Sequence, residues 1–347
     1  MSTFYPLTVS SLKALTPNAV AISFVIPTKL KEIFTFDAGQ HLTLKQTIGG
    51  KEVRRAYSIS SSPKETEMTV GIKRVPGGAF SEWANKDLKE GDVIQVIPPK
   101  GHFVFKPASK PQHIAAFAAG SGITPIISIA KSVLESHSDN TFVLVYGNQN
   151  LQETMYHSEL LDLVKLYTDR FFIQFLYSRA NEADSLFGRI EASTVNLILK
   201  NKFKDRVFDD FYLCGPEDMI NTVKDALYNS GIAKDHIHSE LFTTSQEEEV
   251  SDLSGQTSLE VTLEDEVYSL VMDRKKLVLD AVLDEDIDAP YSCQGGVCST
   301  CIARVTEGKA EMVKNQILTD SEIEEGFILT CQSHPITPIL KIDYDDV

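Results

Sequence analysis

Three cysteines lie within nine residues near the C-terminal end of the chain, in the segment CQGGVCSTC at 293–301. The next cysteine is Cys331, so the spacing is C-x4-C-x2-C-x29-C, while the fifth cysteine, Cys214, lies far upstream. Three thiols in one short loop constrain the backbone strongly, because the loop must wrap closely around whatever the thiols bind. The adjacent glycines Gly295 and Gly296 permit such a close approach.

This spacing is that of a plant-type 2Fe–2S centre, in which four thiolates hold two sulfide-bridged irons. It predicts metal ligands at Cys293, Cys298, Cys301 and Cys331. A structural zinc site is the alternative, but zinc sites usually present two close pairs of ligands, and here only Cys298 and Cys301 form a C-x2-C pair. The odd number and uneven placement of the cysteines argue against a secreted disulfide scaffold.

The length and charge of the chain exclude several classes of protein. A chain of 347 residues indicates two or three domains. The formal net charge of −16 argues against nucleic acid as a partner, because binding to phosphates needs clustered lysine and arginine. The most apolar stretch, residues 113–134, is interrupted by glycine and proline, so we expect no membrane span. No signal peptide is recognisable at the N-terminus, and a cytoplasmic location is expected.

The remaining sequence divides into three parts by its hydrophobic pattern. Residues 4–106 carry short alternating runs separated by glycine and proline, which predict an antiparallel β-barrel. Residues 112–230 alternate continuous apolar runs with helical spacing, which predicts a doubly wound α/β sheet. We therefore expect a small barrel domain at 1–106, a nucleotide-binding α/β domain at 112–242, a polar tether at 243–256 and a cysteine-containing domain at 257–347.

Four motifs occur in a fixed order in front of the cysteines: RAYS at 55–58, GGAFS at 77–81, GSGITP at 120–125 and CGP at 214–216. In this order the chain resembles the ferredoxin–NADP reductase family. With the C-terminal cysteines, it is similar to the branch of that family that serves oxygenases. The resemblance covers essentially the whole chain, and it implies a ferredoxin domain with an α+β β-grasp fold at 257–347.

The resemblance implies an FAD site on the barrel. Arg55 offers a planar fork for a pyrophosphate, and the residues after Gly77 present backbone N–H groups at a helix N-terminus. Without the resemblance, RAYS would be read as an exposed strand and GGAFS as a turn. FMN remains an alternative to FAD on physical grounds. The implied flavin contacts are His41, Arg55, Ala56, Tyr57, Ser58, Ile72, Lys73, Gly78, Ala79, Phe80, Ser81, Thr124 and Phe242.

A second set of residues is implied to bind NADPH. The loop at 120–125 is not a G-x-G-x-x-G fingerprint, but its glycines allow a phosphate to meet the start of a helix. Ser178 and Arg179 suit a 2′-phosphate better than the acidic residue typical of NAD sites. The implied contacts are Gly120, Ser121, Gly122, Thr124, Pro125, Ser178, Arg179, Arg189, Cys214, Gly215 and Pro216. The residues implied to lie at the reacting rings are Tyr57, Ser58, Thr124, Cys214 and Glu240.

Together these sites predict a reductase that passes electrons from NADPH through FAD and the 2Fe–2S cluster to a partner oxygenase. The resemblance implies a multi-subunit di-iron monooxygenase acting on an aromatic acyl-CoA. Residues 257–347 contain 19 acidic and 7 basic side chains, a charge that suits a basic docking face. The alternatives are another acceptor, such as a Rieske oxygenase, a hybrid-cluster protein or a desaturase, and a nonenzymatic redox carrier or sensor.

Overall fold

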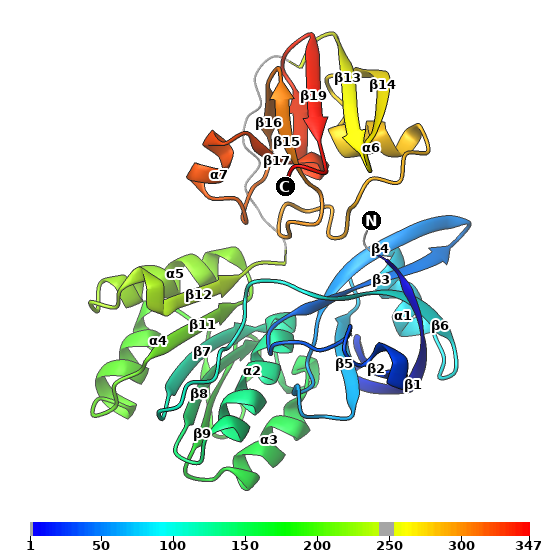
Figure 1. The fold of residues 1–347 in the computed structure, drawn as a ribbon. Coiled ribbons are helices and arrows are strands. Elements are labelled where there is room, and N and C mark those ends of the chain that lie inside the picture. The colour runs from blue at the N-terminus through cyan, green and yellow to red at the C-terminus, as the bar shows by residue number, and fades with distance from the viewer. Residues whose placement is uncertain (1–2, 243–252) are drawn as a thin grey trace. The chain divides into compact units, whose positions relative to one another are not determined.

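The computed structural model describes residues 3–242 and 253–347 (Figure 1). Residues 4–240 form one compact unit, and residues 241–347 belong to a second. Most of the predicted tether at 243–256 lies outside the described residues, since only its last four residues are among them. In the described part of the chain, no helix is long and apolar enough to cross a membrane.

The first part of the larger unit is an antiparallel barrel with the strand order β4-β3-β6-β1-β2-β5. Its strands are β1 (Tyr5–Thr16), β2 (Ala19–Val25), β3 (His41–Ile48), β4 (Lys51–Ser58), β5 (Glu67–Lys73) and β6 (Val93–Lys100). A bridge between Ile59 and Val70 closes the barrel, and the N–H of Ser60 donates to the carbonyl of Thr69 at 2.8 Å. The antiparallel barrel predicted from the alternating runs is therefore present.

Helix α1 (Ala79–Lys86) lies against this barrel, and a short 3-10 turn, η1 (Thr28–Leu30), follows β2. The GGAFS motif lies at the N-terminus of α1, as predicted, with Gly78 as the N-cap. The ring of Phe80, in the first turn, is buried in the barrel core. Buried and more exposed side chains alternate along the strands, for example at the buried Leu7 and Val9 of β1. This alternation is the pattern that predicted strands from the sequence.

The second part of the larger unit is a six-stranded parallel sheet in the order β10-β9-β8-β7-β11-β12. Its strands are β7 (His113–Ala119), β8 (Thr141–Asn148), β9 (Phe171–Tyr177), β10 (Ser185–Phe187), β11 (Asp210–Cys214) and β12 (Ile237–Glu240). The predicted doubly wound sheet is thus confirmed. The two edge strands β10 and β12 were not singled out from sequence, since they are short and only partly buried.

Helices cover both faces of this sheet (Figure 1). The helical elements are η2 (Gly120–Gly122), α2 (Ile123–Ser136), η3 (Leu151–Glu153), α3 (His157–Leu166), α4 (Ala192–Asn196), the π-helical η4 (Leu197–Lys202), α5 (Glu217–Tyr228) and η5 (Lys234–His236). Residues of α2 and α3 share one buried cluster with β7 and β8. Pro125 lies in the first turn of α2, where its missing N–H leaves no helical hydrogen bond unmade.

The smaller unit is a mixed sheet in the order β14-β13-β19-β15-β17, with its own core. Its elements are β13 (Gln256–Leu263), β14 (Glu266–Asp273), α6 (Val278–Asp284), β15 (Ile302–Glu307), β16 (Ala310–Met312), α7 (Asp320–Glu324), β17 (Phe327–Leu329), η6 (Thr330–Gln332), β18 (Ser333–Pro335) and β19 (Ile339–Asp343). Glu264 and Asp265 form the two-residue turn between β13 and β14, both with positive φ, as a tight hairpin turn requires. Helix α6 packs on this sheet in a β-grasp arrangement.

Candidate functional site

The four predicted ligand cysteines come together in the smaller unit. The Sγ atoms of Cys293 and Cys298 lie 3.2 Å apart, and Cys331 interacts with both Cys293 and Cys301. Cys298, Cys301 and Cys331 are buried, while Cys293 is half-buried. Residues far apart in the chain thus supply one set of sulfur atoms, as the spacing predicted.

The loop that carries three of these thiols has almost no regular structure but is held by specific contacts. Gly296 has φ +72°, and a Cβ placed there would lie 2.8 Å from the carbonyl oxygen of Lys314. The N–H of Gln316 donates to the carbonyl of Gly296 at 3.0 Å, and Nε2 of Gln332 donates to the carbonyl of Gln294 at 3.1 Å. Only glycine at 296 therefore lets the cysteine loop lie this close to the backbone of Lys314.

These residues fit a 2Fe–2S cluster. The donor set is four sulfurs, and the N–H of Gly295 points at Sγ of Cys293 at 3.3 Å, the kind of contact that tunes such a cluster. The neighbouring Cys293 thiol and burial raise the pKa of the Cys298 thiol. Crowding and burial therefore disfavour the thiolate form of Cys298 in the absence of metal. Bound iron would favour the thiolate forms of all four ligands.

The predicted nucleotide loop lies at the carboxyl edge of the parallel sheet. Gly120, with φ +55°, follows β7 and leads through η2 into the N-terminus of α2. A Cβ on Gly122 would collide with the carbonyl oxygen of Cys214, so this loop and the end of β11 are in direct contact. Motifs about ninety residues apart thus form one edge, which is where open α/β sheets bind their ligands.

Cys214 is a buried neutral thiol at this edge. It is the last residue of β11 and pairs in register with Glu240 on the neighbouring parallel strand β12. Burial and, secondarily, the Glu240 carboxylate raise the pKa of the Cys214 thiol. The structure therefore brings together Thr124, Cys214 and Glu240 at the ends of adjacent elements, while Gly215 and Pro216 lead from β11 into α5.

The residues predicted to read the adenosine end follow the neighbouring strands β9 and β10. The N–H groups of Ser178 and Arg179 donate to the carbonyls of Asn148 and Gln149, at 3.0 and 2.9 Å. These bonds fix the backbone after β9 and leave the side chain of Arg179 exposed. Arg189 follows β10 and is also exposed. Two guanidinium groups thus extend from the same edge of the sheet.

The flavin residues predicted from RAYS lie at the end of β4. Nη1 of Arg55 donates to the carbonyl of Arg54 at 2.7 Å, and the ring of Tyr57 lies 5.5 Å from that of Phe80. Ser58 is buried and pairs with His41 across β3 and β4. The residues of β4 and the start of α1 are therefore neighbours, as a flavin site would require.

His41 is a neutral imidazole under ordinary conditions. Burial, followed by the nearby charges of Lys100 and His102, lowers its pKa to about 4. Its ring lies so close to Gly101 that a Cβ there would be 3.1 Å from Nδ1. The predicted flavin contact at His41 would thus be made by an uncharged ring.

Several predicted flavin contacts have side chains that serve the fold. Ile72 and Phe80 are buried in the barrel core, so only their backbones are available to a ligand. The hydroxyl of Ser81 accepts from the N–H of Val75 at 3.0 Å and donates to the carbonyl of Gly78 at 3.1 Å. Phe242 lies beyond β12 in the smaller unit, with 36% of its surface exposed. Ala56 and Ala79 offer only backbone groups and a methyl.

Lys73, predicted as a flavin contact, also lies near the nucleotide loop, which the sequence did not indicate. Its Nζ lies 3.9 Å from Oε2 of Glu153, and it would lie 3.9 Å from a Cβ placed on Gly120. Glu153 also accepts a hydrogen bond from Nδ2 of Asn18 at 2.9 Å. A barrel lysine therefore lies beside the nucleotide loop, between the two predicted cofactor sites.

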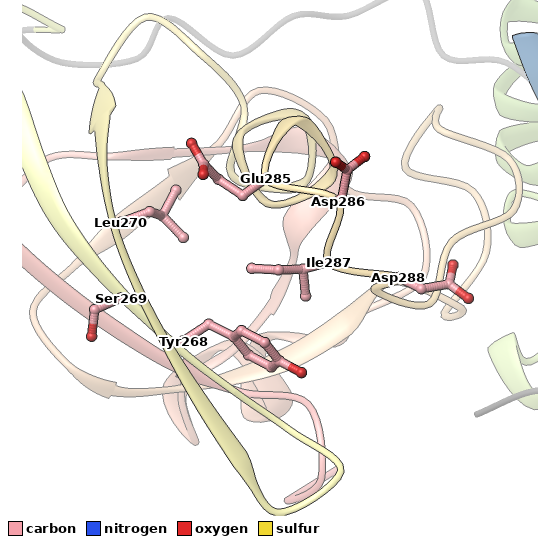
Figure 2. Close-up of a pocket in the computed structure, with 7 residues that line it drawn as sticks. All are labelled: Tyr268, Ser269, Leu270, Glu285, Asp286, Ile287 and Asp288. Atoms are coloured by element: carbon pink, nitrogen blue, oxygen red, sulfur yellow. The ribbon is translucent and has the colours of Figure 1, made fainter.

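A hollow of about 420 Å³ lies elsewhere, in the smaller unit, between β14 and the segment after α6. Figure 2 shows Tyr268, Leu270 and Ile287 around this hollow, with the carboxylates of Asp286 and Asp288 turned away from it. None of the residues predicted from the motifs lines it. The hollow is therefore not formed by the cysteine loop.

Comparisons with known proteins find three domain families along the chain. An oxidoreductase FAD-binding domain matches residues 6–105, an oxidoreductase NAD-binding domain matches 117–225, and a 2Fe-2S iron-sulfur cluster binding domain matches 261–335. The chain is 35% identical to a component of 1,2-phenylacetyl-CoA epoxidase from Escherichia coli, over 99% of both chains. The chain belongs to the ferredoxin–NADP reductase family.

Other relatives are similar along nearly the whole chain of this reductase. The ferredoxin reductase component of 3-ketosteroid-9-alpha-monooxygenase from Rhodococcus rhodochrous is 34% identical, over 97% of this chain and 96% of that protein. The structure of phthalate dioxygenase reductase superposes with a TM-score of 0.66 at 21% identity, covering 98% of each chain, which shows the shared fold. The chain is thus an oxidoreductase with FAD, pyridine-nucleotide and 2Fe–2S domains, and the zinc alternative is not supported.

Proposed function

We propose that this reductase transfers electrons from NADPH through FAD and its 2Fe–2S cluster to a di-iron oxygenase, with phenylacetyl-CoA epoxidase as the specific partner. The observation that carries the proposal is the contact between Gly71 of β5 and Thr124 of α2. A Cβ on Gly71 would lie 2.8 Å from Cγ2 of Thr124. The strand proposed to face the flavin therefore touches the loop proposed to face the nicotinamide.

The chain's own residues hold and orient the reactants. Arg55 and the N–H groups at the start of α1 bind the flavin pyrophosphate, and Ser58 orients the ring. When bound, FAD accepts the two electrons of a hydride and releases them one at a time to the cluster. Cys214 and Thr124 close the nicotinamide side, where a buried neutral thiol excludes water without adding charge.

NADPH is proposed over NADH because of the two exposed guanidinium groups after β9 and β10. Arg179 and Arg189 can each bind a 2′-phosphate, and the hydroxyl of Ser178 adds a neutral donor. A site for NAD would more often offer a carboxylate to the ribose hydroxyl. FAD is proposed over FMN since an FAD-binding domain matches the barrel.

The oxygenase partner is proposed from the relatives, which are named as components of an epoxidase and of monooxygenases. The excess of acidic over basic residues in 257–347, 19 against 7, would favour a basic docking face on that partner. A monooxygenase acting on a different substrate is the second candidate, since the steroid monooxygenase relative is nearly as similar. We propose a cytoplasmic location for the pair.

Anaerobic stopped-flow absorbance tests the electron path and the nucleotide together. We expect NADPH to bleach the flavin first and the cluster band next, faster than NADH does. The Arg179→Gln variant should lose about tenfold or more of the preference for NADPH, the scale of one charge-assisted contact. Lys204→Gln, which removes an exposed cation from the loop before β11, should leave the preference unchanged.

Equal rates with both nucleotides would contradict the choice of NADPH, and no reduction by either would contradict the electron path. The partner is tested separately by mixing the reduced protein with the di-iron component of phenylacetyl-CoA epoxidase, oxygen and phenylacetyl-CoA. Reoxidation of the cluster coupled to epoxide formation is the expected result. Reoxidation without product would point to another acceptor.

A further inference from the structure

Helix α2 carries a polar stripe on one face. Thr124, Ser128, Lys131 and Glu135 recur at i, i+4, i+7 and i+11, so they lie one above another along the helix. The other face of α2 is apolar and packs in the core of the sheet. A polar stripe opposite an apolar face normally lies in solvent, but here Thr124, Ser128 and Lys131 are buried. Something other than water must therefore satisfy them.

The hydroxyl of Thr124 donates to the carbonyl of Ser121 at 3.0 Å. The barrel satisfies Ser128 and Lys131 through the loop of residues 59–66, which joins β4 to β5. Oγ of Ser128 donates to the carbonyl of Ser61 at 2.6 Å. Nζ of Lys131 donates to Oε1 of Glu65 at 2.8 Å, and the hydroxyl of Ser62 donates to the carboxylate of Glu135. Three residues of this loop thus contact three side chains of the stripe.

Lys131 is the centre of this contact. Besides Glu65, its ammonium group contacts Oε1 of Glu159 on α3 at 2.6 Å and the carbonyl of Ser60 at 3.4 Å. Burial lowers the pKa of Lys131, but the two carboxylates outweigh that effect and leave it raised, so the side chain is charged. One cation therefore links the barrel loop, α2 and α3.

Tyr156 makes a second link beside it. This residue precedes α3 in a left-handed conformation, with φ +58°, and its Oη donates to Oγ of Ser60 at 2.8 Å. A Cβ on Gly71 would lie 2.6 Å from that Oη, so β5 passes directly under the tyrosine. Tyr156, at the start of α3, thus contacts both strand β5 and the loop before it.

We propose that the polar stripe of α2 is a positioning device that sets the distance between flavin and nicotinamide, with Lys131 as its principal positioning residue. The proposal rests on the placement of FAD and NADPH given above. The loop 59–66 begins directly after Ser58 and leads into the strand that carries Lys73, while Thr124 heads the stripe. A fixed loop on α2 therefore fixes both reacting rings relative to each other.

The chemistry of the stripe suits positioning better than it suits stability. A buried ion pair often stabilises no more than a well-packed apolar contact would, because both charges lose water. It does, however, demand one register, since a cation shifted along the helix would lose its carboxylates. Hydride transfer is sensitive to such shifts, and a displacement of about 1 Å can cost about 100-fold in rate.

The test compares Lys131→Met, Lys131→Arg and the control Lys165→Met, which removes an exposed lysine of α3 that pairs with Asp162. Each holoprotein is mixed anaerobically with saturating NADPH, and hydrogen exchange of residues 59–73 is measured in parallel. We expect Lys131→Met to lower the limiting rate of flavin reduction at least tenfold with an unchanged KM for NADPH. Exchange at 59–73 should rise, and Lys131→Arg should recover much of both.

A limiting rate within twofold of the wild type, even with a lower Tm, would overturn the proposal and leave Lys131 as a stabilising residue. If the Met variant fails to fold, Ser128→Ala removes a single bond to the same loop and should lower the limiting rate with KM unchanged; an unchanged rate would count against the stripe. If wild-type protein is not reduced by either nucleotide, the proposed function fails instead. The exchange measurement then decides the stripe, since unchanged exchange at 59–73 would overturn it.

Discussion

The cysteine loop at 293–301 and the polar stripe of α2 differ in how far apart in the sequence their contributing residues lie. The cysteine loop gathers three of its four sulfur donors from nine residues, with glycine where the backbone bends. The stripe depends on contacts such as Ser128 to Ser61, which are 67 residues apart in the chain. A metal site can therefore be built largely from one short segment. Fixing α2 against the barrel instead requires contacts between elements that are distant in the sequence.

The largest effect should come from removing one cluster ligand. Cys331→Ser should abolish the cluster absorbance and bound iron, because the fourth thiolate comes from a separate element that nothing in the loop can replace. Reduction of the flavin by NADPH should persist, since the flavin and nucleotide domains form a unit of their own. Iron analysis and stopped-flow absorbance measure both.

Cys214→Ser is the matched control for that experiment, because it alters the one cysteine outside the cluster set. It should retain full iron content. Loss of iron in this variant, or retention of a normal cluster in Cys331→Ser, would contradict the assignment of ligands.

The second-largest effect should come from a glycine substitution in the nucleotide loop, and the matching substitution in the cysteine loop should have little effect. Gly122→Ala should weaken NADPH binding tenfold or more and destabilise the larger unit by about 1–3 kcal/mol, because its Cβ meets the backbone of Cys214. Gly295→Ala should be tolerated, since its nearest neighbour would lie at an ordinary 3.8 Å. Nucleotide titration and iron content test the pair, and equal tolerance of both changes would contradict the packing described.

His41 should give a smaller, pH-dependent effect. Its folded pKa of about 4 lies below the unfolded value of 6.5, so the unfolded chain takes up the proton first as the pH falls. Stability should therefore be lost between pH 6.5 and pH 4, by at most about 3 kcal/mol. His41→Gln should flatten this dependence, as followed in urea through the fluorescence of Trp83, the only tryptophan. Parallel pH profiles for both proteins would contradict the lowered pKa of His41.

The smallest effect should come from a purely local contact. The hydroxyl of Thr319 caps α7 by accepting from the N–H of Glu322 at 3.3 Å, within a capping box. Thr319→Ala should destabilise the smaller unit by about 1 kcal/mol and leave iron content and flavin reduction unchanged. Thermal unfolding followed at the cluster band measures this, and a change in flavin reduction would show that the two units are more tightly coupled than we expect.

Much of the fold was readable because local patterns match their surroundings. Alternating runs predicted the barrel, and continuous apolar runs predicted the buried parallel strands. The edge strands β10 and β12 were not predicted, because three or four half-buried residues are too few to show a hydrophobic alternation. The GGAFS motif predicted a helix N-terminus, but that α1 begins at Ala79 and buries Phe80 in the core was visible only in the structure.

The predicted cofactor residues show the same limit. Motif order suggested which residues face FAD and NADPH, and that assignment stays a prediction. It did not show that Ile72 is wholly in the core, that Lys73 lies beside Gly120, or that Lys131 bridges the barrel and α3. One signal was available: Lys131 is the only charged residue between Ile123 and Leu134 of α2. A lone charge in an apolar helix needs a partner.

The sequence by itself predicted the cluster ligands and determined the three domain types and the order of the cofactor motifs, because these are recorded in spacing and hydrophobic pattern along the chain. Only the tertiary structure decided which loop satisfies the stripe of α2, why Gly71 and Gly122 have no room for a side chain, and which strand places Glu240 beside Cys214. These are contacts between surfaces that meet only after the chain has folded. Their partners are chosen by packing and by the need to satisfy buried polar groups, which no local spacing records.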